Sequence, residues 1–372
     1  MSELVTNDPA LGATPLGRIP EAGLIVQDGR VVWVGPERSA PAADRALNLG
    51  GRAVLPGWVD SHTHLVHGGD PGRGPWAIVE ATRRTDDATL LAAARRHRAR
   101  MLLGGTTCAE TATGFGLTAA DERRTALTAA AAGFDEITFL GAHLVPVEYH
   151  GDPDGYVDLV CGPMLDAVEG SVDWIDVCCA GGAFDEAQSR RVLAAGQRKG
   201  LGLRVHADPT DPGAGVRVAV DVAAASVAHC TRLTGADIDL LAGSATVTTL
   251  LPAGELAAGQ PPAPGRALLD AGAPVALASG GTPGASFTSS MNLVVALAVL
   301  RGGLTIGEAV FAATAGGAAA LRRTDVGHLA PGARADIHVL DAPSHDHLVH
   351  QIGMPLSSRV FRHGVEVGGA AG

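Results

Sequence analysis

Histidines follow or end several of the apolar runs in this sequence, and histidine can bind a metal or move a proton near neutral pH. His62 and His64 close the run AVLPGWVDSHTH, and His143, His206 and His229 lie at the ends of three later runs. Two residues apart on a strand, His62 and His64 would point to the same side of the chain. Imidazole nitrogens suit zinc, iron, nickel or copper better than calcium or magnesium. The pattern predicts a transition-metal site.

Eight short apolar runs must position these side chains, and most are followed by an Ala-, Leu- and Arg-rich helical pattern. The runs are AVLPGWVDSHTH, GTTCAET, EITFLGAH, WIDVCCA, LGLRVHA, ASVAHC, ATVTTLLP and PVALASGG. Continuous apolar runs are typical of parallel strands that are buried on both faces. Eight such units predict a closed (β/α)₈ TIM barrel, whose active site lies at the carboxyl ends of its strands.

Both ends of the chain are predicted to be β-rich. The stretch GLIVQDGRVVWVGP predicts a hairpin with its turn at Asp28-Gly29, and ADIHVLD and SRVFRHGVEVGG predict further strands. We therefore expect a small β-sandwich domain built from residues 1–55 with 335–372, beside a barrel catalytic domain over residues 56–334. The spaced tail histidines His345, His347 and His350 are expected on the surface.

The composition is that of a compact protein without a nucleic-acid or membrane partner. Of the 372 residues, 46% are hydrophobic and 18% charged, which is enough to bury a large core. The net charge of −11 and the lack of Lys/Arg runs argue against nucleic acid or membrane partners. We find no signal-peptide pattern and no stretch long enough for a membrane span. Five cysteines without metal-finger spacing favour a reduced, cytoplasmic protein.

The motifs resemble a known family. LPGWVDSHTH, the strand-end His206 and the terminal strands look like the amidohydrolase superfamily. TFLGAHLVPVEY, DGYVDLVCGPMLDA, VAHCTRLT, TPGASFTSSM and RRTDVGHLAPGARADIHVLDAPSH resemble the imidazolonepropionase family, the ring-opening enzymes of histidine breakdown. The similarity extends over most of the chain.

By that resemblance, His62, His64 and His206 are metal ligands, His229 lies near the metal-bound water, and His143 contacts the substrate. We expect His229 and His143 to be catalytic, with His229 either a fourth metal ligand or the general base. Binuclear members of the superfamily bridge two metals with a carbamylated lysine. Lys199 is the only lysine and precedes its strand, which favours a single divalent ion, zinc rather than iron. The resemblance also allows a homodimer, for which no residue gives evidence.

The sequence departs from the family at the expected barrel mouth. In ALASGGTPG, Gly280 stands where the family has an aspartate that binds the metal and takes a proton from water. General-base catalysis contributes about 10²–10⁴ in rate. Phe115 replaces a tyrosine, Pro71 replaces an arginine with Arg73 two residues on, and Pro209 replaces a polar residue.

These departures predict a remodelled pocket. Its expected lining is His67, Arg73, Phe115, His143 and Gly280. The expected function is a metal-dependent amidohydrolase that acts on a C–N bond of a small cyclic amide, amidine or related nitrogen heterocycle other than imidazolonepropionate. One alternative is a non-hydrolytic enzyme of a biosynthetic pathway, catalysing elimination, cyclisation or isomerisation. The other is an inactive metal-binding paralogue.

Overall fold

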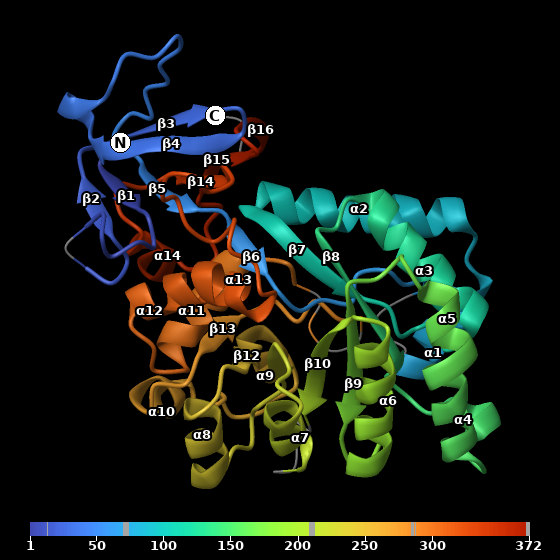
Figure 1. Cartoon of the computed structure of the whole chain (residues 1–372). Coiled ribbons are helices and arrows are strands. Elements are labelled where there is room, and N and C mark those ends of the chain that lie inside the picture. The colour runs from blue at the N-terminus through green and yellow to red at the C-terminus, as the bar shows by residue number, and fades with distance from the viewer. Residues whose placement is uncertain (13, 70–73, 208–212, 284–285, 287, 370–372) are drawn as a thin grey trace. The chain divides into compact units, whose positions relative to one another are not determined.

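The structure, a computed structural model, describes residues 1–12, 14–69, 74–207, 213–283, 286 and 288–369 (Figure 1). The chain forms two compact units. One contains Met1–Asp60, Ala99–Cys108 and Ser290–Gly372, and the other contains Ser61–Arg98 and Ala109–Ser289.

The predicted barrel is present as an eight-stranded sheet in the order β13-β12-β11-β10-β9-β8-β7-β6. Its strands are β6 (Trp58–Asp60), β7 (Thr106–Ala112), β8 (Glu136–Ala142), β9 (Trp174–Cys179), β10 (Gly202–Ala207), β11 (Ser226–Ala228), β12 (Val247–Leu250) and β13 (Val275–Leu277). From β7 to β13, each strand is parallel to the next. Two backbone hydrogen bonds close the ring: His64 N–H donates to the Gly281 carbonyl at 2.8 Å, and Gly280 N–H donates to the His62 carbonyl at 3.1 Å.

The first apolar run is divided between two sheets, which corrects the prediction of one strand bearing both histidines. AVLP forms β5 (Ala53–Pro56) in the terminal sheet, and only Trp58–Asp60 enters the barrel as β6. Gly57 lies between the two strands. The position requires glycine, since a Cβ there would lie 2.2 Å from Thr107 Oγ1. His62 and His64 therefore follow the strand instead of lying within it.

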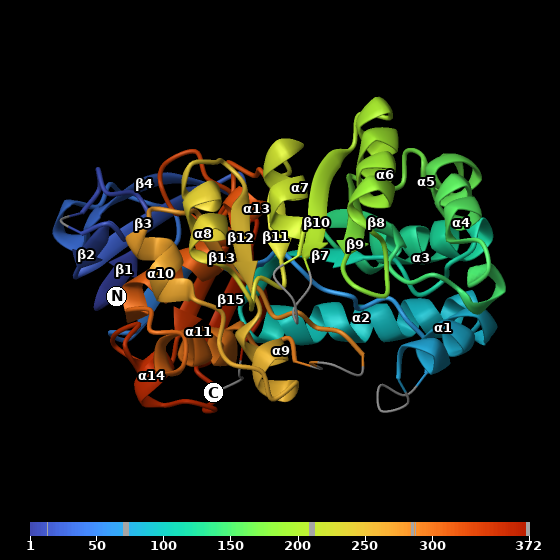
Figure 2. The ribbon, with the colours of Figure 1, turned by 90° about the horizontal axis from the view of Figure 1, so that it is seen from below.

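Helices follow the barrel strands, as the alternating pattern predicted (Figure 2). Their bounds are α1 (Pro75–Arg84), α2 (Asp87–Leu103), α3 (Ala119–Ala132), α4 (Pro153–Leu159), α5 (Leu165–Val168), α6 (Glu186–Arg198), α7 (Gly215–Asp221), α8 (Gly235–Ala242), α9 (Pro252–Ala257), α10 (Gly265–Asp270), α11 (Met291–Leu300), α12 (Ile306–Phe311), α13 (Gly317–Ala320) and α14 (His347–His350).

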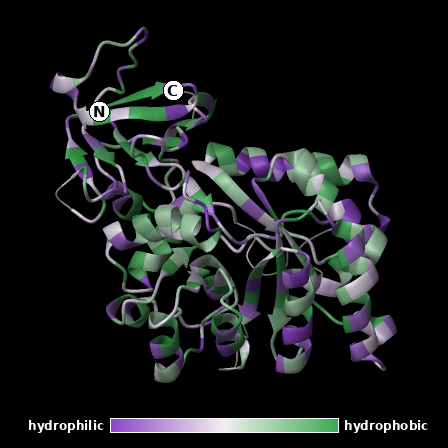
Figure 3. Cartoon of the chain, viewed as in Figure 1, coloured by the Kyte–Doolittle hydropathy of each residue, from purple (hydrophilic) through white to green (hydrophobic). Residues whose placement is uncertain are grey.

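Helix α6 shows how these helices pack. Asp185 caps its N-terminus in a capping box with Gln188. Val192, Leu193 and Gly196 are buried at helical spacing, and the opposite face is polar, which gives the alternating bands of α6 in Figure 3. Gly196 permits a close approach to β9, since a Cβ there would lie 2.2 Å from Ile175.

The terminal segments form the predicted strands. A six-stranded sheet has the order β16-β15-β14-β5-β1-β2, and β3 and β4 form a separate hairpin. The bounds are β1 (Glu3–Val5), β2 (Arg18–Pro20), β3 (Ala22–Gln27), β4 (Arg30–Pro36), β14 (Ile337–Leu340), β15 (Ser357–Arg362) and β16 (Val365–Gly368). One hydrophobic cluster takes Leu4 and Val54 from the larger sheet and Val31 from the hairpin. The predicted domain boundaries stay a prediction.

His345 is not on the surface, contrary to expectation. Its side chain is buried, and its Nδ1 lies 2.7 Å from Glu3 Oε1, so an acidic partner near the other end of the chain accounts for its burial. The five cysteines, all of which lie among the described residues, form no disulfide. Within the described part of the chain, no helix is both long and apolar enough to cross a membrane.

Candidate metal centre

Three histidines converge at the carboxyl ends of the barrel strands. His62 and His64 follow β6, and His206 lies near the end of β10. A nitrogen from each ring lies within 4.8 Å of one from each of the others, and only 2–4% of each residue is exposed. The Nε2 atoms of His64 and His206 are 3.3 Å apart.

This donor set fits a divalent transition metal. Among the described residues, the buried Nε2 of His62 has no hydrogen-bond partner. Leaving a buried polar atom unpaired costs about 1–3 kcal/mol, and a metal ion would satisfy such nitrogens. Three imidazole nitrogens that face one point are the ligands preferred by zinc, iron, nickel or copper.

Asp176 fixes the orientation of His206, and sequence reasoning missed it. It lies on β9, beside β10, with Oδ2 2.8 Å from His206 Nδ1. A carboxylate that accepts from Nδ1–H leaves Nε2 as the free donor for a metal. Burial raises the pKa of Asp176, but His206 and Arg204 outweigh that effect and lower it. The available signal was an acid within the apolar run WIDVCC.

The rings of His62 and His64 are neutral, as metal binding requires. Burial, followed by repulsion from the neighbouring histidines, lowers the pKa of both His62 and His64 well below the usual 6.5. Protons therefore do not compete with a metal for these nitrogens near neutral pH.

The segment that carries His62 and His64 is held by Glu110 of β7. Thr63 N–H donates to Glu110 Oε2 at 3.0 Å, and the Thr63 hydroxyl donates to the Glu110 carbonyl at 2.6 Å. Burial raises the Glu110 pKa to about 7, although Arg204, 3.7 Å away, opposes the shift. Arg204 also donates to the Ser61 carbonyl, so two buried side chains support the histidine segment.

His229 lies beside the three histidines. It follows β11, and its ring centroid is 5.3 Å from that of His206 and 5.5 Å from that of His62. Its backbone φ of 61° is unusual for a residue other than glycine and is typical of strain at functional sites. Burial lowers the His229 pKa to about 3, so the ring is neutral and offers a nitrogen lone pair to a metal or to a hydrogen-bond donor.

His143 follows β8 and stacks on His64, with centroids 5.5 Å apart and planes at 12°. Its Nδ1–H donates to the Gly114 carbonyl at 3.0 Å, which leaves Nε2 without a proton. Burial lowers the His143 pKa to about 4. Phe115 packs edge-on to this ring, with centroids 5.2 Å apart.

The other residues named from the sequence do not all lie at the histidine cluster. Gly280 follows β13 with φ 60°, next to the histidine segment to which it is hydrogen-bonded. His67 is buried, with its ring 6.3 Å from that of Phe115, so it is not solvent-facing. Lys199 ends α6 and pairs with Asp166 and Glu169 at 2.8 and 2.9 Å. Three residues named from the sequence, Pro71, Arg73 and Pro209, lie outside the described residues.

Comparisons with known proteins identify the family. Residues 189–362 match the model of the amidohydrolase family. An imidazolonepropionase from Saccharopolyspora erythraea is 54% identical over 99% of this chain and 98% of its own length. The chain belongs to the imidazolonepropionase family. Another family member, from Salinispora arenicola, is 52% identical over 98% of this chain and 97% of its own.

Solved structures of more distant proteins share the fold. A zinc complex of atrazine chlorohydrolase from Arthrobacter aurescens is 20% identical, with a TM-score of 0.76 over 99% of this chain and 94% of its own. A zinc-bound adenosine deaminase from Xanthomonas campestris is 21% identical, with a TM-score of 0.74 over 98% of this chain and 91% of its own.

The prediction of a substrate other than imidazolonepropionate is wrong. Relatives about half identical over nearly the whole chain are imidazolonepropionases. The substitution at Gly280 removes one carboxylate, whereas five histidines remain gathered at the site. Family membership identifies a metal-dependent hydrolase of a cyclic C–N amide bond, so the non-hydrolytic and inactive alternatives are also set aside.

Proposed function

We propose that the chain is an imidazolonepropionase, which opens the imidazolone ring of imidazolonepropionate by hydrolysis. The proposal rests on the half-identical relatives of that name, which match nearly end to end. Water adds to the ring amide carbon, the ring C–N bond breaks, and the released nitrogen takes a proton. The former carbonyl carbon becomes a carboxylate.

We assign His62, His64 and His206 as the ligands of one zinc ion. Their convergence and the zinc in two structural neighbours support the assignment. With its single lysine on the surface, the chain lacks the bridging residue of a binuclear site. Bound there, the metal would polarise the ring carbonyl and lower the pKa of water.

His229 then takes the proton from the attacking water, and His143 contacts the substrate. His229 is neutral and lies beside two of the ligand rings. Since Gly280 stands where the family resemblance places an aspartate, His229 is the base in this proposal and not a fourth metal ligand. His67, Phe115 and Gly280 would shape the pocket around the ring.

The test is the loss of ultraviolet absorbance of imidazolonepropionate with zinc-loaded and metal-stripped protein. We expect turnover only with about one metal per chain. We expect His206→Ala to lose both metal and activity, and His229→Gln to keep metal and lose about 10²–10⁴ in kcat. Absence of turnover with stoichiometric metal would contradict the proposed function.

A Gly280→Asp variant examines the missing carboxylate. The three atoms nearest to a Cβ at this position belong to Leu251, the first at an ordinary 3.4 Å, and aspartate tolerates positive φ better than most residues. We expect it to fold and to raise kcat, while a matched Gly280→Val variant loses stability. A kcat no higher than that of the natural chain would show that the missing carboxylate does not limit turnover.

We further propose that the enzyme acts in the cytoplasm as a homodimer. The five free cysteines fit a reducing compartment. Sedimentation analysis tests the dimer directly, and a single monomeric species would reject it.

A further inference from the structure

The loop after β7, residues 113–117, contributes two groups to the surroundings of the candidate metal centre. Gly114 supplies the carbonyl that accepts from His143 Nδ1–H, and Phe115 packs against the rings of His64 and His143. The backbone of the loop is irregular: Gly114 has φ 104° and Leu117 has φ 56°. Such a segment needs outside partners for its backbone N–H groups.

Glu122 supplies those partners. It lies in the first turn of α3 and is fully buried. Its Oε1 accepts from Gly116 N–H at 2.9 Å and from Leu117 N–H at 2.8 Å, and its Oε2 accepts from Gly114 N–H at 3.0 Å. The Thr113 hydroxyl also hydrogen-bonds this carboxylate. One side chain thus satisfies donors from four of the five loop residues.

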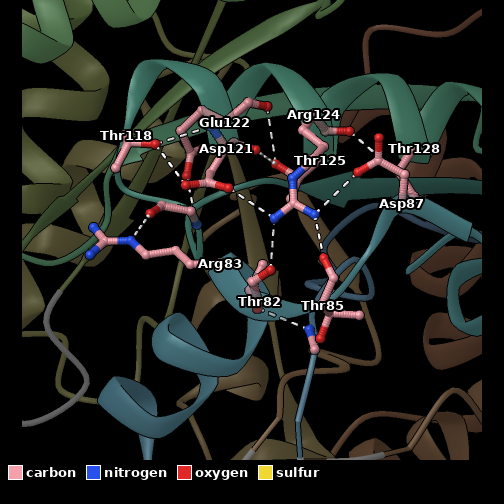
Figure 4. Close-up of polar contacts among 12 residues, drawn as sticks. Thr82, Arg83, Thr85, Asp87, Thr118, Asp121, Glu122, Arg124, Thr125 and Thr128 are labelled. Carbon is pink, nitrogen blue, oxygen red and sulfur yellow. Dashed lines mark hydrogen bonds and ion pairs between the residues drawn. The ribbon is translucent and has the colours of Figure 1, made fainter. Parts of the chain in front are cut away.

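The loop is fixed from two other directions. Leu140 N–H, near the end of β8, donates to Thr113 Oγ1 at 3.1 Å. Arg83 of α1, labelled in Figure 4, donates through Nε to the Gly116 carbonyl at 2.7 Å. These contacts fix the direction of the Gly114 carbonyl. Because a carbonyl oxygen can only accept a hydrogen bond, its partner His143 Nδ1 must carry the hydrogen.

We propose that Glu122 is a positioning residue, which orients the Gly114 carbonyl and thereby holds His143 in its Nδ1–H tautomer with Nε2 available as a hydrogen-bond acceptor. With Nδ1 bound to the Gly114 carbonyl, Nε2 is the ring nitrogen that remains as an acceptor. His143 Nε2 would then accept a hydrogen bond from an N–H group of the bound imidazolone ring. This part of the inference rests on the proposed function. If Glu122 loses its acceptor role, His143 can rotate or exchange tautomers, and Nε2 then presents a donor to the same group.

The test uses Glu122→Gln in full-length, zinc-loaded protein. The amide keeps the size of the side chain, but its NH₂ cannot accept from backbone N–H. The matched control is Glu136→Gln: Glu136 is also buried, accepts from Trp174 Nε1 at 2.9 Å, and begins the same strand that ends before His143. In Glu136→Gln, the amide oxygen can still accept a hydrogen bond from the Trp174 indole N–H.

Nitrogen-15 NMR of labelled histidines identifies the tautomer without turnover, with the His143 signal assigned by its loss in His143→Gln. We expect Nδ1–H in the natural chain and in Glu136→Gln, and a mixed or Nε2–H form in Glu122→Gln. We expect kcat to fall about tenfold to a hundredfold in Glu122→Gln, with metal content unchanged, and to stay unchanged in the control.

An Nε2–H signal in the natural chain, or an unaltered tautomer in folded Glu122→Gln, would overturn the proposal. If Glu122→Gln does not fold, Glu122→Asp keeps the charge but withdraws it by one methylene, and the same shift in tautomer is expected. If imidazolonepropionate is not turned over at all, the NMR result still decides the role of Glu122.

Discussion

A histidine ring that binds a metal through Nε2 needs its Nδ1 hydrogen held in place, and Asp176 does this for His206. Loss of such a supporting carboxylate commonly costs ten- to a hundredfold in metal affinity. We expect Asp176→Asn to weaken zinc binding by about that factor, because the amide can present its NH₂ to Nδ1 and favour the wrong tautomer.

Competition with a chelator of known affinity measures this effect. Asp173→Asn is the control, since Asp173 precedes the same strand at its other end and accepts from Ile137 N–H. Unchanged zinc affinity in Asp176→Asn would show that Asp176 does not support the metal site.

At this scale the sequence predicted the histidines but not the carboxylates that orient them. Strand-end position was enough to single out His62, His64, His143, His206 and His229. Asp176 became visible only through the pairing of β9 with β10, in which His206 lies opposite Cys178. Glu122 was hidden because its partners are backbone N–H groups, which leave no pattern in side-chain types.

At the scale of elements, Arg124 joins α1, α2 and α3. Its guanidinium donates to the carbonyls of Thr82 and Thr85 at 2.7 and 2.6 Å and pairs with Asp121 at 2.8 Å and Asp87 at 3.2 Å (Figure 4). These contacts satisfy carbonyls at the end of α1 and fix the turn into α2.

We expect Arg124→Leu to lower the free energy of unfolding by about 2 kcal/mol, because charge-assisted hydrogen bonds to otherwise unpaired carbonyls are lost. Urea denaturation measures this. The neighbouring Arg123 is exposed, so Arg123→Leu should change stability by less than about 0.5 kcal/mol. Equal effects of the two variants would contradict a specific role for Arg124.

The barrel strands were predictable because burial on both faces leaves long apolar runs. The division of AVLPGWVDSHTH between two sheets was not. It depends on the pairing of β5 with β1 and β14 in the terminal sheet, and β14 comes from a distant part of the sequence. The hairpin at Asp28-Gly29 was predictable because its turn is local.

At the scale of the whole molecule, His338 makes stability depend on pH. It is buried against Trp58 and hydrogen-bonds Ser357, and burial lowers its pKa from 6.5 to about 3. Between these values the unfolded chain binds the proton and the folded chain does not. The contribution of His338 to the free energy of unfolding is therefore complete above pH 6.5. It declines as the pH falls toward 3, by up to about 1.4 kcal/mol per pH unit.

Urea denaturation at pH 7.5, 6 and 5 tests this dependence. We expect His338→Gln to be less stable at pH 7.5 but to lose less on acidification than the natural chain. His350→Gln, at an exposed position, should keep the natural slope. Identical slopes for all three proteins would exclude His338 as a source of acid sensitivity.

The two hydrogen bonds that close the barrel join residues 62–64, which contain two of the proposed ligands, to Gly280 and Gly281. Occupancy of the site and integrity of the barrel ring are therefore coupled thermodynamically. A metal ion bound by His62, His64 and His206 would hold the segment after β6 in place against β10. It would thereby favour the hydrogen bonds that this segment makes with Gly280 and Gly281. Demetallation would thus act as a local unlocking, and the amide hydrogens of His64 and Gly280 would be the first in the barrel to exchange with solvent.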